Sequence, residues 1–260
     1  MTKEKLLGFI LTPVFLVLFI STLLVFHPFL FLAYKLFGYR AHKVVLEIMN
    51  RCIVNELRLV GTKFEFLVPE GLPTDRPLIV ISNHQSMYDI PLLILSLKKH
   101  HPKFIAKREL AYGLPSISYA LRTMGSAIID RKDHKQAIRA IEKFAVEVNN
   151  ANHAACVFPE GTRAKDGQIK KFKSAGISTL MKHMPQALVV PVVIARNWEI
   201  LKYKFLPVPF GVKVTLKVLE PLEIGQNSGK EICEKVEKII EKELKSLEIN
   251  SGPIDRQIAA

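Results

Sequence analysis

A histidine and an aspartate lie close together in a segment of the chain suited to proton transfer. His84 and Asp89 follow directly after the apolar run from Leu78 to Ser82. A histidine can take up a proton at neutral pH, and a carboxylate bonded to its second ring nitrogen fixes the tautomer. On a straight helix their spacing places the two side chains about 140° apart, so they meet only if the chain turns near Ser86. The alternative is a polar loop in which Asp89 is the N-cap of a helix.

A second polar segment is suited to anion binding. Glu160 to Arg163 combines a carboxylate, a flexible turn and a guanidinium that can bind phosphate with two hydrogen bonds. The alternative is an ordinary turn between a strand and a helix, with an ion pair on the surface. Lys107 ends another apolar run, and basic residues recur in 98–108 and 163–173. Such runs are usually solvated surface, so contact with a ligand is the less common outcome.

Apolar runs and helical patterns predict the elements that position these segments. The predicted strands are 57–60, 63–66, 78–82, 103–106, 126–130, 155–158, 188–194 and 212–219, and the predicted helices are 38–56, 90–97, 134–149, 174–182 and 230–247. This alternation is typical of one α/β domain with a single, mainly parallel sheet flanked by helices. Ligands bind such sheets beyond the carboxyl ends of the strands, where both polar segments are predicted to lie.

The N-terminal segment is predicted to anchor the chain to a membrane. Residues 6–26 contain no charged side chain, and as a helix they would span roughly 31 Å, about the thickness of the hydrocarbon layer. Pro13 and a break at Pro28 permit the alternative of two shorter helices lying in one leaflet, so spanning and lying in the leaflet both stay open. Basic residues flank both ends, so the charge bias does not choose an orientation. We expect a membrane-anchoring segment in 1–43 and a catalytic domain in 44–260.

The composition is both apolar and basic. Hydrophobic residues make up 49% of the 260 residues and charged residues 23%, which excludes general disorder and fits one catalytic-sized domain. The 37 Lys and Arg against 24 Asp and Glu give a net charge of +13, which indicates anionic partners. Nucleic acid is disfavoured because aromatic residues do not interleave with the basic runs. Cys52, Cys156 and Cys233 have no metal-type spacing, so we expect no metal site and a reduced, cytoplasm-facing domain.

The two polar segments resemble the signatures of a known family. Asn83 to Asp89 matches the NHxxxxD signature, and Phe158 to Arg163 matches the FPEGTR signature, of the glycerolipid acyltransferases. Within that family the chain is similar to the 1-acyl-glycerol-3-phosphate acyltransferases of bacterial phospholipid synthesis, over roughly residues 57–222. Two further blocks resemble the family in the expected order: Lys107 to Leu110 with Gly113 and Ile129 to Arg131, then Val189 to Val193.

The resemblance implies acyl transfer without an acyl-enzyme. His84 would deprotonate the sn-2 hydroxyl of lysophosphatidate, and Asp89 would hold the imidazole. No serine nucleophile is then needed, which agrees with the absence of a GxSxG motif. No cofactor is implied, because acyl-CoA or acyl carrier protein is the donor substrate. The resemblance also implies that phosphate and glycerol are bound by Lys107, Arg131, Glu160, Gly161, Thr162 and Arg163, and that Pro191 shapes the acyl or acceptor site.

The resemblance further implies a membrane-associated enzyme. Its partners would be a lysophospholipid acceptor, acyl-CoA or acyl carrier protein, and the bilayer, and its place the bacterial inner membrane with the catalytic domain facing the cytoplasm. Two alternatives stay open. The chain could be a member of the same family that acts on another lysophospholipid or on a lipid A precursor. It could also be a non-catalytic, basic module that binds anionic lipid at the membrane.

Overall fold

The computed structural model describes residues 3–250, in which eight strands form one sheet. The strands are β1 (Lys63–Leu67), β2 (Leu78–Ser82), β3 (Lys103–Lys107), β4 (Ala127–Ile129), β5 (Ala154–Val157), β6 (Leu188–Ala195), β7 (Lys213–Val218) and β8 (Leu222–Glu223). Seven of them lie in the order β1-β7-β6-β2-β5-β3-β4, and β8 pairs with β6. Strands β2 to β6 run parallel, whereas β7 and β8 run antiparallel to β6, and β1 runs parallel to β7. The predicted mainly parallel α/β fold is confirmed.

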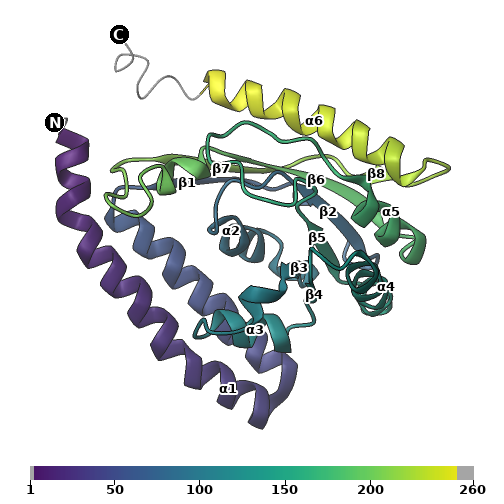
Figure 1. The fold of residues 1–260 in the computed structure, drawn as a ribbon, viewed down its shortest axis with the longest axis horizontal. Helices are drawn as coiled ribbons and strands as arrows, with labels where there is room; N and C mark the ends of the chain where they lie inside the picture. Colours follow the sequence, from purple (N-terminus) through teal and green to yellow (C-terminus); the bar gives the residue numbers. More distant parts are fainter. Residues whose placement is uncertain (1–2, 251–260) are drawn as a thin grey trace.

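Helices cover both faces of the sheet and create two separate cores. Leu78 and Val80 of β2 belong to one core, and Ile79 and Ile81 belong to the other. Because both faces are covered, these four positions are all apolar, as is typical of buried parallel strands. The first face is covered by α1 (Lys3–Leu59), α2 (Asp89–Ser96) and α3 (Ile117–Thr123), and the second by α4 (His134–Asn150), α5 (Ser174–His183) and α6 (Gly229–Asn250) (Figure 1).

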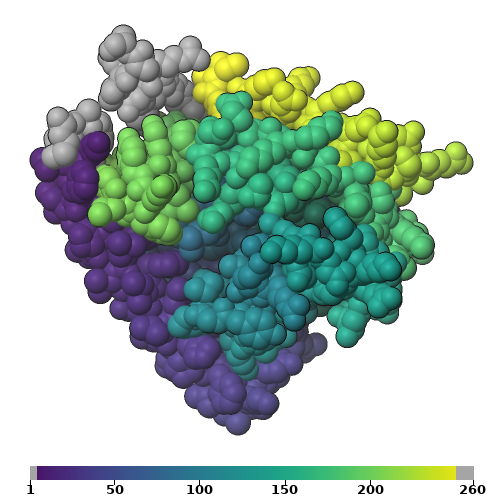
Figure 2. All heavy atoms as spheres, in the orientation of Figure 1, coloured from purple at the N-terminus to yellow at the C-terminus, as the bar shows by residue number. Residues whose placement is uncertain are grey.

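Helix α1 consists of two arms that meet at Gly38. Residues 3–37 run along one flank of the molecule, and residues 39–59 return toward the sheet (Figures 1 and 2). At Gly38, φ is 74° and ψ is −162°, a combination that is essentially restricted to glycine. Pro13 and Pro28 both lie inside the first arm, so the predicted break at Pro28 is wrong. Packing of the first arm against the domain offsets the helix-breaking effect of these prolines.

The second arm extends as far as Leu59, so the predicted strand at 57–60 is also wrong. Ile53, Leu57 and Val60 follow a helical spacing and are all buried in the core beneath the sheet. Four alternating residues are compatible with either a strand or a helix, and packing decides between them. The predicted boundary after residue 43 falls inside this arm, and as a functional division it stays a prediction.

Hydrogen bonds join the first arm to the rest of the domain at two positions along its length. The backbone N–H of Val208 donates to Thr12 Oγ1 at 2.8 Å, and Ser116 Oγ donates to the carbonyl oxygen of Leu23 at 2.6 Å. Both hydroxyl-bearing residues are fully buried. The first arm therefore lies along the α/β domain and does not project away from it.

The outward side of the first arm is strongly apolar. By length and composition, α1 contains a stretch that could cross a membrane, although Gly38 divides the helix. Side chains on this side are well exposed, with Val17 at 65%, Leu36 at 67% and Phe37 at 75%. Exposed apolar side chains are ordinary when scattered singly, but a continuous row marks an interaction surface.

Candidate active site

The carboxyl ends of the parallel strands bring the predicted site residues to one edge of the sheet. His84 follows β2, Glu160 follows β5, Lys107 ends β3 and Arg131 follows β4. These four strands are neighbours in the order β2-β5-β3-β4. Segments that are far apart in the sequence therefore converge, as the sequence predicts for an open parallel sheet.

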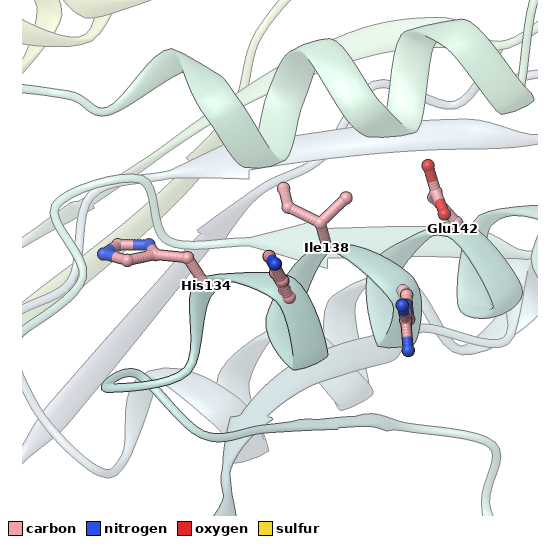
Figure 3. A pocket seen from close by; sticks show the side chains of 5 residues that line it. His134, Ile138 and Glu142 are labelled. Carbon is pink, nitrogen blue, oxygen red and sulfur yellow. The ribbon is translucent and has the colours of Figure 1, made fainter.

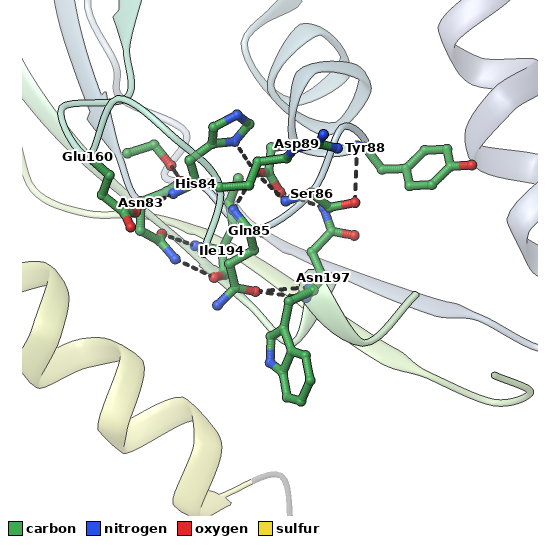
Figure 4. Close-up of polar contacts among 12 residues, drawn as sticks. Asn83, His84, Gln85, Ser86, Tyr88, Asp89, Glu160, Ile194 and Asn197 are labelled. Carbon is green, nitrogen blue, oxygen red and sulfur yellow. Dashed lines mark hydrogen bonds and ion pairs between the residues drawn. The ribbon is translucent and has the colours of Figure 1, made fainter. Parts of the chain in front are cut away.

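His84 and Asp89 form a hydrogen-bonded pair. Their Nδ1 and Oδ2 atoms are 2.7 Å apart, and the side chain of His84 is 17% exposed while that of Asp89 is completely buried. Asp89 Oδ2 also accepts the backbone N–H groups of Gln85 at 2.7 Å and Ser86 at 2.9 Å. The carboxylate thus closes the turn that lets the two side chains meet (Figure 4). Asp89 is the first residue of α2, after an N-cap at Tyr88, so the alternative of Asp89 as N-cap is wrong.

The pair leaves one imidazole nitrogen available for chemistry. A carboxylate accepts, so Nδ1 of His84 carries the hydrogen of this contact, and in the neutral tautomer the lone pair of the ring lies on Nε2. Within residues 3–250, no side chain or backbone group is hydrogen-bonded to that Nε2. The ring itself is stacked on Phe158, with centroids 4.1 Å apart and planes inclined by 20°. The arrangement is that of a general base with a fixed ring and an open nitrogen.

Glu160 fixes the backbone of the histidine. Its Oε1 accepts the backbone N–H of His84 at 2.6 Å, and its Oε2 accepts that of Lys170 at 3.0 Å. The side chain is buried, and this burial raises the pKa of the Glu160 carboxyl, although the two backbone N–H groups counteract the rise. On the other side of the histidine, the N–H of Ala164 donates to the carbonyl of His84 at 2.7 Å. The predicted contact of Glu160 with glycerol stays a prediction; the contacts observed position the base.

Two amide side chains beside His84, which the sequence analysis did not single out, anchor it to β6. Asn83 exchanges two hydrogen bonds with the backbone of Ile194, at 2.8 and 2.9 Å. Gln85 Oε1 accepts the backbone N–H of Asn197 at 2.9 Å. Asn83 and Gln85 are both buried. The sequence signal that could have identified them is an amide residue on each side of a histidine directly after an apolar strand. Nothing in the local sequence distinguishes Asn197, which is also buried.

The predicted phosphate-binding side chains lie at the open edge of this site. Thr162 and Arg163 are exposed, and Gly161 forms the tight turn before them with a φ of 72°. A Cβ atom built on Gly161 would lie 3.6 Å from Lys173 Nζ, so that ammonium group is a further cation beside the turn. Lys107 is partly buried and contacts Glu109 at 3.0 Å. The strand ends and the turn at Gly161 therefore carry several cations, although their contact with a phosphate stays a prediction.

Pro191 lies in the middle of β6, fully enclosed between neighbouring strands. It is in register with Ile81 of β2, and its carbonyl accepts the N–H of Leu219 at 2.9 Å. On its other edge β6 pairs with β8 before this position and with β7 after it. The missing N–H of proline thus falls where β6 changes partners, which explains its tolerance in an interior strand. Its predicted role in shaping the acyl or acceptor site stays untested.

A shallow hollow on α4 contains none of the predicted site residues. Its lining includes His134, Ile138 and Glu142, together with two basic side chains of the same helix (Figure 3). All of these residues come from one helix, so the hollow is a surface depression rather than a deep cleft. The chemistry of the chain is better sought at His84.

Comparison with known proteins gives a consistent result. The profile of the family described as Acyltransferase matches residues 63–195, which include both polar segments. A chloroplast 1-acyl-sn-glycerol-3-phosphate acyltransferase of Arabidopsis thaliana is 34% identical over 133 residues, 51% of this chain and 36% of the relative. The 1-acyl-sn-glycerol-3-phosphate acyltransferase of Saccharomyces cerevisiae is 25% identical over 208 residues, 79% of this chain and 67% of the relative.

A solved structure is similar over nearly the whole chain. The crystal structure of the 1-acyl-sn-glycerophosphate (LPA) acyltransferase PlsC from Thermotoga maritima superposes with a TM-score of 0.78 and 26% sequence identity. It covers 94% of this chain and 98% of its own. By contrast, the sequence matches span 36%, 37% and 51% of the first three curated relatives.

Proposed function

The chain belongs to the acyltransferase family, and we propose that it transfers an acyl group from an acyl thioester to the sn-2 hydroxyl of lysophosphatidate, giving phosphatidate. The names of the plant, yeast and Thermotoga maritima proteins support this acceptor. The observation that carries the proposal is the His84–Asp89 pair, whose 2.7 Å contact leaves Nε2 of the histidine open.

The proposed reaction is a direct transfer. Nε2 of His84 takes the proton of the acceptor hydroxyl as its oxygen attacks the thioester carbonyl, and Asp89 stabilises the imidazolium that forms. The tetrahedral intermediate collapses with loss of the thiolate, which takes the proton back from His84 and leaves as the free thiol. No protein nucleophile is required. Cys156 and Cys233 are both buried, which supports a mechanism without a thioester-linked enzyme.

Cations at the strand ends would bind the acceptor phosphate. Arg163 is exposed beside the turn at Gly161, and its guanidinium can bind two phosphate oxygens at once. Lys107 and Arg131 follow the neighbouring strands, and Lys173 adds a further charge beside the turn. This arrangement favours a phosphate-bearing acceptor over a neutral alcohol, because each cation lies on the same edge as the base.

The two arms of α1, which meet at Gly38 and which we call the apolar hairpin, would hold the enzyme on the bilayer. The first arm stays in contact with the domain at Thr12 and at Leu23, while its outward side exposes a row of large apolar residues. We therefore place both arms in one leaflet rather than across the membrane, so that the site lies at headgroup depth. The three cysteines are unpaired, which supports the cytoplasmic face, where thiols stay reduced.

Turnover by the full chain in lysolipid-containing vesicles tests this proposal. Purified wild type is given lysophosphatidate, a lysophospholipid with a headgroup, or a lipid A precursor, each with acyl-CoA and with acyl carrier protein as donor. We expect turnover of lysophosphatidate, and we expect His84→Ala to lower it by at least ~10³-fold. His134→Ala, which changes an exposed histidine on α4, is the matched control and should be fully active.

Two results would contradict the proposal. Turnover of another acceptor but not of lysophosphatidate would keep the family and replace the substrate. Binding to anionic vesicles without turnover of any acceptor, unchanged by His84→Ala, would favour a non-catalytic lipid-binding module.

A further inference from the structure

We propose that Asn197 is a positioning residue that completes the catalytic pair by holding the second oxygen of Asp89. The inference rests on the proposed acyl transfer and adds a third member to its proton-handling group. Asn197 lies in the short helix η3 (Asn197–Leu201), directly after β6 and 108 residues from Asp89 in the sequence.

The two carboxylate oxygens of Asp89 have different hydrogen-bond partners. Oδ2 accepts from Nδ1 of His84 and from the backbone N–H groups of Gln85 and Ser86. Oδ1 accepts from Nδ2 of Asn197 at 2.5 Å (Figure 4), and within the described residues this is its single side-chain partner. A hydrogen bond to the second oxygen adds to the resistance of the carboxylate against rotation, because rotation about Cβ–Cγ moves both oxygens. The amide of Asn197 therefore fixes the orientation in which Oδ2 faces the imidazole.

The turn after β6 fixes the position of the Asn197 amide. Arg196, the residue before it, has a φ of 63°, which is uncommon for a non-glycine residue. The guanidinium of Arg196 donates to both carboxylate oxygens of Glu199, at 2.7 and 3.1 Å, and so bridges the turn that contains Asn197. The backbone N–H of Asn197 donates to Gln85 Oε1 at 2.9 Å. Backbone and side chain of Asn197 thus both contact the His84 to Asp89 segment.

The other end of the amide explains which interaction matters. Oδ1 of Asn197 is buried and has no hydrogen-bond partner among the described residues. A buried acceptor without a partner is unfavourable, and a small apolar residue at this position would avoid it. Reversing the amide would bring two oxygens together at Asp89, so the orientation is unambiguous. Among the described residues, the hydrogen bond that the side-chain amide donates to Asp89 is its one polar contact.

Two variants of Asn197 separate positioning from simple stability. Asn197→Ala removes the donor, and we expect kcat to fall about 10- to 100-fold with little change in the KM for lysophosphatidate. Asn197→Asp keeps the shape. Because two adjacent buried carboxyl groups cannot both ionise easily, the introduced group should keep its proton at low pH and donate to Asp89. Its activity relative to wild type should therefore fall as pH rises, while the relative activity of Asn197→Ala stays flat.

A matched control tests for an effect of lost stability. Asn50 is also buried and donates one side-chain hydrogen bond, to the carbonyl of Leu46 at 2.7 Å. Asn50→Ala should lower the melting temperature by an amount similar to that of Asn197→Ala, yet retain wild-type kcat. Equal kcat losses in both variants at equal stability would overturn the proposal.

A readout that needs no turnover keeps this inference separate from the proposed function. In protein labelled with ¹⁵N-histidine, the Nδ1–H proton of His84 should give a downfield resonance that His84→Ala removes. Asn197→Ala should broaden or shift that resonance, and Asn50→Ala should not. If the wild type turns over no acceptor, the proposed function fails, but this spectrum still tests the hold on Asp89. An unchanged resonance together with unchanged kcat in Asn197→Ala would refute the role of Asn197.

Discussion

Glu160 Oε1 accepts the backbone N–H of His84 at 2.6 Å across 76 residues of sequence. The two polar segments of the chain are thus parts of one structure, since the carboxylate of Glu160 fixes the backbone that carries His84. The same side chain also holds Lys170 through its second oxygen, and the N–H of Ala164 in the same loop donates to the carbonyl of His84, so the loop of basic residues after β5 is joined to the histidine on both sides.

Glu160→Gln should impair both stability and activity. A glutamine has one acceptor oxygen, so one of the two backbone N–H groups would face an NH₂ group. We expect a loss of about 1–3 kcal/mol in the free energy of unfolding and a fall in kcat of about 10- to 100-fold. Thermal denaturation and steady-state kinetics measure the two effects. Glu237→Gln is the control, because Glu237 accepts the N–H of Phe172 in the same loop without touching His84. Equal kcat losses would mean that the loop, not the base, is what Glu160 supports.

Arg163→Ala should weaken acceptor binding more than it slows chemistry. A hydrogen bond to a charged group is worth about 1.5–3 kcal/mol, so the KM for lysophosphatidate should rise more than about 10-fold while kcat changes less. Arg163→Lys should recover part of the loss, since it keeps the charge without the paired donors. Arg139→Ala, on the exposed side of α4, should leave KM unchanged. An unaltered KM in Arg163→Ala would remove this residue from the phosphate site.

Gly38→Ala should destabilise the hairpin. The φ and ψ of Gly38 lie in a region where a side chain costs about 1–3 kcal/mol, and the arms meet at this residue. We expect a lower melting temperature and weaker flotation with lipid vesicles. Gly176→Ala lies inside α5, with no atom within 4 Å of the added methyl group, and should be neutral or slightly stabilising. If both variants behave alike, the turn between the arms does not depend on glycine.

A partly buried cluster of titratable groups lies where the second arm of α1 meets the sheet. Lys103 Nζ donates to the hydroxyl of Tyr39 at 2.7 Å, and that hydroxyl also contacts His101 Nδ1 at 2.9 Å. The rings of His101 and His153 are stacked with centroids 4.6 Å apart. Burial, assisted by the nearby charge of Lys43, lowers the pKa of Lys103 to about 7. Burial likewise lowers the pKa of each of the two stacked histidines to about 4.

These shifts predict that stability rises with pH. Between pH 6.5 and about 4 the unfolded state binds protons that the two partly buried histidines of the folded state do not, so the free energy of unfolding should fall on acidification. From about pH 7 to 10.5, Lys103 should make it rise. Melting temperatures at pH 5, 7 and 9 test both limbs. Lys103→Met should be more stable than wild type at pH 7 and lose the upper limb, whereas Lys132→Met, at an exposed position, should keep it. A flat profile in wild type would contradict the burial of these charges.

The sequence predicts most of the strands and helices because burial on both faces leaves continuous apolar runs, as in Leu78 to Ile81. It also brings His84 and Asp89 together, through the signature that they share with a known family. It fails where distant packing decides the outcome. The helix at 57–59 forms because Leu57 packs into the core, and no break forms at Pro28 because the first arm packs against the domain, whereas the division at Gly38 coincides with the start of the predicted helix 38–56. Asn197 escapes notice because its role arises only when β6 lies beside β2, which no local pattern records.

The position of β6 also determines when the site around His84 and Asp89 can form during synthesis of the chain. This strand inserts between β2 and β7, and it delivers both Ile194, which anchors Asn83, and Asn197, which holds Asp89. The apolar first arm precedes β6 in the chain, and the hydrogen bonds that hold Asn83 and Asp89 are incomplete until residue 197 has been synthesised and β6 has entered the sheet. A nascent chain therefore carries the apolar row of the first arm before the contacts of His84 and Asp89 can be complete, so contact with a bilayer can precede the proposed chemistry.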